Sequence, residues 1–125
     1  MRIEQAALLA GVLASIWTCG CSSSMSDASV ITGGDPRKGA AAIYRYGCGS
    51  CHTISRIENA RGLVGPPLDG IRNRYYVAGM LNNNPDNLMS WIRNPKAVNP
   101  KTAMPALGLS AQDATDIAAF LYSLD

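Results

Sequence analysis

The sequence predicts an all-α domain behind an amino-terminal leader. Three stretches of the chain place apolar residues at helical spacing, and each begins at a residue that can cap a helix. Glycine, proline and asparagine fill the segments between these stretches, and no alternating apolar run predicts a strand. Past the leader about 100 residues remain, which is enough for one small domain.

The first residues resemble a targeting segment. Arg2 supplies an early positive charge, and residues 6–17 are almost continuously apolar, a run too short to span a bilayer comfortably. Cys19 and Cys21 follow in a layout that resembles the cleavage region of bacterial lipoproteins, and the small residue before Cys21 favours it as the lipidated one. The alternatives are lipidation of Cys19, an ordinary signal peptide or an uncleaved anchor. We expect residues 1–20 to be a leader, and the protein to be exported to the periplasmic side and tethered to the membrane.

The segment after the leader predicts a flexible tether. Residues 21–34 are rich in serine, glycine and aspartate and nearly lack large apolar side chains. The folded domain is expected over residues 35–125. Its first helix is predicted to begin at Asp35 and Pro36, because aspartate caps helices and proline is tolerated at the first helical position. This helix is expected to run to about Gly47, with an apolar stripe of Ala40, Ile43 and Tyr44.

Two further helices have their own start signals. Asn84 can cap a helix that has Pro85 at its first position and ends at Pro95. Ser110 followed by Asp113 resembles a capping box and predicts the last helix. The apolar face of the first of these helices holds Leu88, Trp91 and Ile92. That of the second holds Ala114, Ile117, Ala118, Leu121 and Leu124.

One motif predicts the chemistry, namely Cys48-Gly49-Ser50-Cys51-His52. Each thiol can add across a haem vinyl group, and a histidine after the second cysteine can ligate the iron. A redox dithiol is the alternative reading of the two cysteines, and a zinc site that includes Cys19 and Cys21 is another. His52 is the only histidine of the chain, so two histidines of one chain cannot hold the iron.

A methionine is therefore the expected second ligand to the iron. Of the methionines at positions 1, 25, 80, 89 and 104, the first two fall in or near the leader. Met104 lies in a loop stiffened by prolines at 95, 100 and 105, and a weakly binding thioether benefits from such restraint. Met80 has no such support, and Met89 falls within a predicted helix.

These motifs together resemble the class I cytochromes c, and the resemblance covers nearly everything from Gly34 to Leu124. It rests on the haem motif, on residues 65–70 and on residues 117–121. It also rests on residues 88–96 and the Thr-Ala-Met-Pro segment after them, a run similar to the cytochrome c domains fused to bacterial haem-copper oxidase subunits. The resemblance implies a fold in which the first and last helices cross, with Gly39 against Phe120, and loops surround one covalently attached c-type haem.

The resemblance assigns the haem ligands. It makes Cys48 and Cys51 the thioether links, His52 the proximal iron ligand and Met104 the distal one. It makes the carbonyl of Pro66 the acceptor of a hydrogen bond from the other ring nitrogen of His52, which orients the imidazole.

Three more residues receive roles from the same resemblance. It places Arg74 and Thr102 near the haem propionates and packs Trp91 beside the methionine ligand. The alternatives are a solvated arginine and a tryptophan that only fills the core. Lys101 departs from the family, which often has glycine there, and this puts the local turn in doubt.

An electron carrier, and not an enzyme, is the function that the resemblance implies. With His52 and Met104 on the iron, no small molecule can bind, and the protein would pass single electrons between membrane-associated respiratory complexes. We expect redox protein partners, such as a quinol-oxidising complex and a haem-copper terminal oxidase, and no nucleic acid. The formal charge of +2 predicts weak electrostatic steering, although Lys96 falls where the family has a lysine at the exposed haem edge. The alternative function is peroxide chemistry or gas sensing at a haem whose Met104 is labile.

Overall fold

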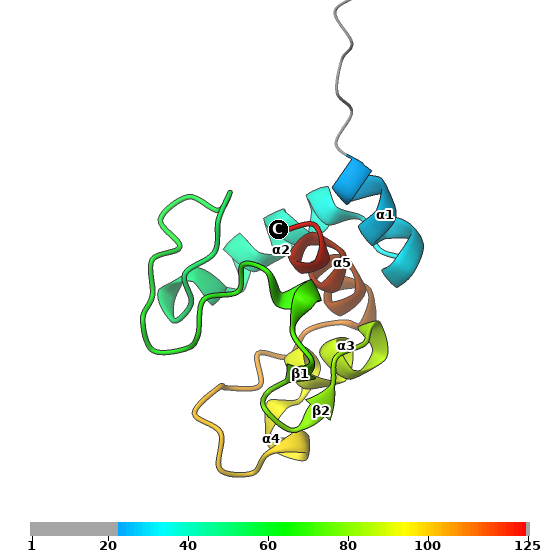
Figure 1. The fold of residues 1–125 in the computed structure, drawn as a ribbon. Coiled ribbons are helices and arrows are strands. Elements are labelled where there is room, and N and C mark those ends of the chain that lie inside the picture. Colours follow the sequence, from blue (N-terminus) through cyan, green and yellow to red (C-terminus); the bar gives the residue numbers. More distant parts are fainter. Residues whose placement is uncertain (1–22, 125) are drawn as a thin grey trace, which may run out of the picture.

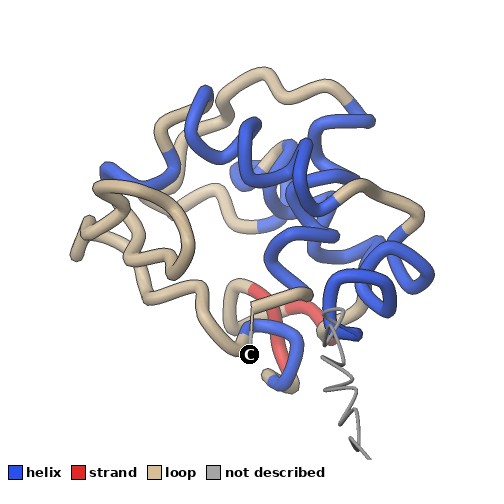
Figure 2. Tube along the Cα trace, turned by 90° about the horizontal axis from the view of Figure 1, so that it is seen from above, coloured by secondary structure: helices blue, strands red, loops and turns tan. Residues whose placement is uncertain are grey.

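Helices form most of the regular structure in residues 23–124, the part of the chain that the computed structural model describes (Figure 1). The helices are α1 (Ser23–Thr32), α2 (Pro36–Arg45), α3 (Pro85–Arg93), α4 (Pro95–Val98) and α5 (Ala111–Tyr122). Short 3₁₀ turns occur at Cys48–Ser50 and Ile71–Asn73, and a small hairpin joins β1 (Tyr76–Val77) to β2 (Leu81–Asn82). Figure 2 shows long loops extending from the cluster of helices. The predicted all-α class is confirmed.

Helices α2 and α5 cross in close contact at the centre of the molecule (Figure 1). A Cβ atom at Gly39 would overlap the carbonyl oxygen of Asp116 and lie 2.9 Å from the Cβ of Phe120. Only glycine lets the two backbones approach this closely. The expected contact between Gly39 and Phe120 is present.

Side-chain caps begin the three predicted helices. Asp35 accepts a hydrogen bond from the backbone N–H of Arg37 at 2.8 Å, and Asn84 accepts one from Asn87 at 2.8 Å. Ser110 accepts one from the N–H of Asp113 at 3.0 Å. These caps satisfy backbone donors that the first turn of a helix leaves without partners, so a local sequence signal determines each helix start.

The helix predicted to begin after Asn84 ends as expected, but the chain then enters another helix. Helix α3 stops at Arg93, and Pro95 becomes the first residue of the short α4. Asn94 lies between them, and its side-chain oxygen accepts a hydrogen bond from the N–H of Ala97 at 3.3 Å. Proline ends one helix because it has no N–H to donate to the preceding turn, and it suits the first position of the next helix, where an N–H would have no partner within the helix.

The prediction of a flexible tether over residues 21–34 is wrong for the residues that form α1. This helix packs against α5, and Ala28 has no exposed surface. The hydroxyl of Thr32, also buried, donates to the carbonyl oxygen of Ala28 at 2.7 Å. The small side chains of this segment let it lie close to α5, and such packing stabilises a helix that its composition does not favour. The leader over residues 1–20 and the lipidation of Cys21 fall outside the described residues.

A small hairpin was also not predicted. Tyr76 pairs with Asn82 and Val77 with Leu81, and strands of two residues are too short to show an alternating pattern. Asn83 fastens the hairpin by donating to the carbonyl oxygen of Arg74 at 2.8 Å and accepting from the hydroxyl of Tyr122 at 2.8 Å. Among residues 23–124, no helix is long and apolar enough to cross a bilayer.

Candidate functional site

The cysteines and the histidine of the motif lie on one short turn directly after α2. Gly47 adopts a left-handed conformation with φ of 70° and turns the chain into the 3₁₀ turn that begins at Cys48. The N–H of His52 then donates to the carbonyl oxygen of Cys48 at 3.0 Å. Cys48 and Cys51 are unpaired thiols, and burial raises the pKa of the Cys48 thiol. Both thiols are therefore available for covalent chemistry.

The ring of His52 is oriented by a single backbone carbonyl. Its Nδ1 lies 2.7 Å from the carbonyl oxygen of Pro66. A carbonyl oxygen only accepts, so Nδ1 holds the ring proton and Nε2 keeps its lone pair for a metal ion. The expected contact between Pro66 and His52 is present.

The motif opens onto a cavity of about 450 Å³. Helices, the hairpin and loops far apart in the sequence form its walls, which are largely apolar. Its surface includes the side chains that could bond to a haem or to its iron, namely Cys48, Cys51, His52 and Met104. Buried side chains of α3 and α5 supply much of the apolar wall, namely Leu88, Ile92, Ile117 and Leu121.

Met104 is the only methionine within residues 23–124 that lines this cavity. Met80 is 56% exposed on the hairpin. The sulfur of Met89 accepts a hydrogen bond from Thr115 at 3.2 Å. The backbone N–H of Met104 donates to the hydroxyl oxygen of Thr102 at 3.1 Å, which helps to hold the loop in place. Of the three methionines compared in the sequence, the structure thus places only Met104 on the cavity.

These residues fit a covalently attached haem. Two thiols at the wall can form thioethers, an imidazole offers an unprotonated Nε2, and a thioether sulfur lies on the surface of the same cavity. The apolar wall suits a flat, largely apolar macrocycle and keeps water from it. Within residues 23–124, no group of three histidine, cysteine or acidic side chains could hold a metal ion. The zinc alternative that includes Cys19 and Cys21 falls outside this part of the chain.

Comparison with known proteins identifies the family. The family model for cytochrome c matches residues 37–125. The chain belongs to the cytochrome c family. Its cofactor is therefore a covalently bound c-type haem with its iron.

Individual relatives agree with this assignment. The cytochrome c of Gibberella zeae is 32% identical over 104 residues, which cover 73% of this chain and 95% of that protein. Cytochrome c oxidase subunit 2 of Alkalihalophilus pseudofirmus is 32% identical over 88 residues, 70% of this chain. The same subunit of Bacillus sp. strain PS3 is 32% identical over 65 residues, 50% of this chain. The cytochrome matches only 25% and 18% of the lengths of these two oxidase subunits.

Arg74, Trp91 and Thr102 all line the cavity of the cytochrome. Trp91 is half-buried there, and its packing beside Met104 stays a prediction. Thr102 accepts from the N–H of Met104 through its hydroxyl oxygen, and the hydroxyl proton remains able to donate. Arg74 donates to the carbonyl oxygens of Pro67 and, at 3.1 Å, Asp69. These contacts show that Arg74 supports the loop after Pro66, while the propionate roles of Arg74 and Thr102 stay predictions.

Sequence reasoning missed Tyr46 as part of the site. Its ring lines the cavity, and its hydroxyl donates to Oδ2 of Asp113 at 2.9 Å. Arg45 donates to Oδ1 of the same carboxylate at 2.7 Å. Hydrogen bonds from Ser110, Tyr46 and Arg45 hold the pKa of Asp113 below its usual range. An aromatic residue two positions before the motif was the available signal, but helical periodicity alone could not direct its ring toward the cavity.

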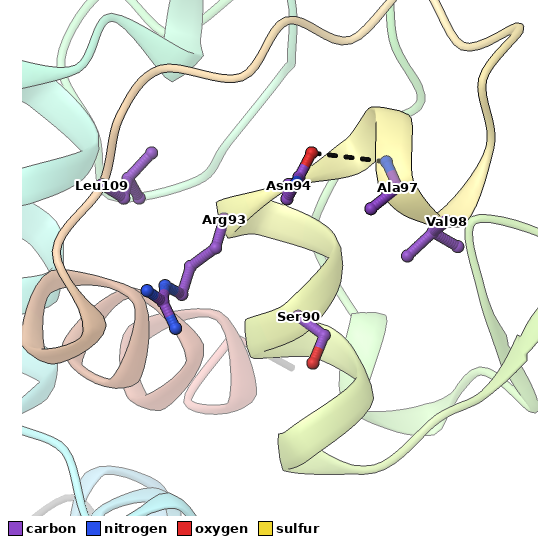
Figure 3. Close-up of a pocket in the computed structure, with 6 residues that line it drawn as sticks. All are labelled: Ser90, Arg93, Asn94, Ala97, Val98 and Leu109. Carbon is purple, nitrogen blue, oxygen red and sulfur yellow. Dashed lines mark hydrogen bonds between the residues drawn. The ribbon is translucent and has the colours of Figure 1, made fainter.

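A second hollow lies beside α3 and α4 (Figure 3) and has a similar volume, about 460 Å³. Its surface holds Ser90, Arg93, Asn94, Ala97, Val98 and Leu109. None of these side chains is a thiol, an imidazole or a thioether, so they offer no ligand for haem iron. The haem therefore belongs in the cavity at the motif and not in this hollow.

Proposed function

We propose that this cytochrome is a carrier of single electrons and not an enzyme. The observation that supports this most directly is the shared cavity of His52 and Met104, whose imidazole and thioether would both be available to ligate a bound haem iron. When bound, the haem supplies an iron that changes by one electron between its ferrous and ferric states. No polar side chain suited to oxygen or peroxide chemistry is needed for such a transfer.

The chain's own residues favour the ferrous state. The carbonyl of Pro66 orients the His52 ring, and the largely apolar wall excludes water from the cavity. A thioether ligand and a surrounding of low dielectric both disfavour the extra charge of ferric iron. We therefore expect a high reduction potential, which suits electron delivery to a terminal oxidase.

We further infer that the cytochrome works outside the cytoplasm, tethered to the membrane through Cys21. The apolar run before Cys21 supports export, and a tether would keep the carrier near membrane complexes. The similarity to cytochrome c oxidase subunit 2 supports a haem-copper oxidase as electron acceptor. A quinol-oxidising complex is the electron donor that we expect.

Visible spectroscopy of the purified holoprotein tests the carrier function. The reduced protein should keep its spectrum when carbon monoxide is added, because Met104 occupies the position that the gas would need. Rapid binding of carbon monoxide would contradict the carrier function and favour peroxide chemistry or gas sensing. Mass spectrometry of the mature amino terminus tests the tether separately, since lipid on Cys21, lipid on Cys19 and no lipid give different masses.

A further inference from the structure

Helix α1 is a rigid part of the haem domain. Ala28 is completely buried and Thr32 nearly so, and the helix packs against α5. Val30, two positions beyond Ala28, is 85% exposed. Two helical positions correspond to a rotation of about 200°, so Val30 lies on the face of α1 opposite α5.

The connection from α1 to α2 is also rigid. Gly33, with φ of 76°, ends α1, and its N–H donates to the carbonyl oxygen of Ser29 at 2.8 Å. A Cβ atom at Gly34 would overlap the carbonyl oxygen of Thr115. The N–H of Asp35 donates to Oδ1 of the buried Asp116 at 2.8 Å. Three successive residues are thus held against α1 or α5, and no hinge separates α1 from the domain.

Rigidity of α1 shortens the reach of an amino-terminal anchor. A flexible tether over residues 22–34 would extend about 45 Å at about 3.5 Å per residue. In the sequence, only Ser22 separates Cys21 from the first residue of α1, so the length of the chain would limit an anchor on Cys21 to about 7 Å from Ser23. The domain would then rest against the lipid surface instead of moving freely above it.

Helix α5 lies between α1 and the haem cavity. Thr115 and Ala119 of α5 contact the junction after α1, whereas Ile117 and Leu121 line the cavity. These two pairs are also separated by about 200° on the helix. In Figure 1, α1 accordingly lies on one side of α5, and the long loops around the cavity lie on the other.

We propose that α1 is a rigid arm that lays its exposed face, centred on Val30, against the lipid surface and points the haem cavity away from it. The proposal rests on the membrane tether inferred above. Val30 and, at the edge of this face, the 44% exposed Ile31 supply apolar surface for the interface with lipid headgroups. The exposed Asp27 lies on the same face, where its carboxylate can remain among the hydrated headgroups. A redox partner would have to place its own redox centre at a fixed height above the membrane, facing the haem cavity.

Linear dichroism of the haem absorption band tests this orientation in full-length holoprotein bound to stacked, oriented bilayers. We expect dichroism in the natural chain. A long Gly-Ser insertion between Ser22 and Ser23 should remove it without changing the visible spectrum, and Val30→Ser should reduce it. Tyr44→Ser is the matched control, because Tyr44 is 71% exposed on α2, and this variant should keep the dichroism.

Three results would overturn the proposed orientation of α1, and each would identify a different error. Protein that sediments with bilayers but shows no dichroism is tethered without a fixed orientation. Protein that stays in the supernatant has no membrane tether, and its response to carbon monoxide still tests electron carriage. Protein that forms dimers in solution, which Val30→Ser converts to monomers, uses this face for a second copy of the chain.

Discussion

Gly65 leaves the imidazole of His52 the space that a side chain would occupy. A Cβ atom at Gly65 would overlap Cε1 of the ring and lie 2.6 Å from Nδ1. Gly65→Ala should therefore displace the ring from Pro66 and lower the yield of holoprotein with a normal visible spectrum. Gly108→Ala is the control, since its added Cβ meets nothing within 4 Å and costs only the strain of a φ of 70°, about 1 kcal/mol. A normal spectrum in Gly65→Ala would contradict this expectation and show that the loop around Gly65 moves to accommodate the added methyl group.

Met104→Ala should open the haem iron to external ligands. The reduced variant is expected to bind carbon monoxide, and its reduction potential should fall because the thioether is lost. Met80→Ala should behave like the natural protein, because Met80 is exposed and does not line the cavity. Visible spectra and potentiometric titration give both readouts. If Met80→Ala binds carbon monoxide instead, the ligand assignment is wrong.

Gly39→Ala should destabilise the domain although alanine favours helices. The change gains up to about 1 kcal/mol of helix propensity. It also places a Cβ atom against the carbonyl oxygen of Asp116, and overpacking of this kind costs about 1 to 3 kcal/mol or more. Urea unfolding should show a net loss of stability. Ala41→Gly, at an exposed position of the same helix, should lose about 1 kcal/mol through propensity alone.

Protonation of Asp113 should make the cytochrome less stable in acid. Hydrogen bonds from Ser110, Tyr46 and Arg45 hold its pKa in the folded state below the unfolded value of about 3.9. The carboxylate therefore contributes stability above about pH 4, and the contribution disappears as the pH falls through the lower, folded-state pKa. Asp113→Asn should lower the melting temperature at neutral pH and approach the natural protein in strong acid. Glu58→Gln, at an exposed loop position, should leave this pH dependence unchanged.

Local signals in the sequence were sufficient for much of the fold and site. Asp35, Asn84 and Ser110 cap their own helices, so each helix start is determined by a few neighbouring residues. The haem motif and the prolines around Met104 are local in the same sense. These features could be predicted because their physical causes lie within a few residues.

Features that depend on distant residues could not be predicted. Helix α1 forms because Ala28 packs against α5, whose residues come much later in the chain. The ring of Tyr46 lines the cavity while its hydroxyl bonds to Asp113, again on α5. Composition suggested a tether and periodicity suggested an ordinary helix face, since neither contains information about the surface that α5 provides.

The crossing of α2 and α5 also affects the order in which the site can assemble. Cys48, Cys51 and His52 precede α5, whose Ile117 and Leu121 close the cavity. If the chain is exported from its amino terminus, as proposed above, both thiols would emerge before Ile117 and Leu121, and haem could be attached while the pocket is still open. Docking of α5 would then complete the apolar wall of the cavity. A chain cut before Ala111 would keep every attachment residue and leave the macrocycle exposed to water.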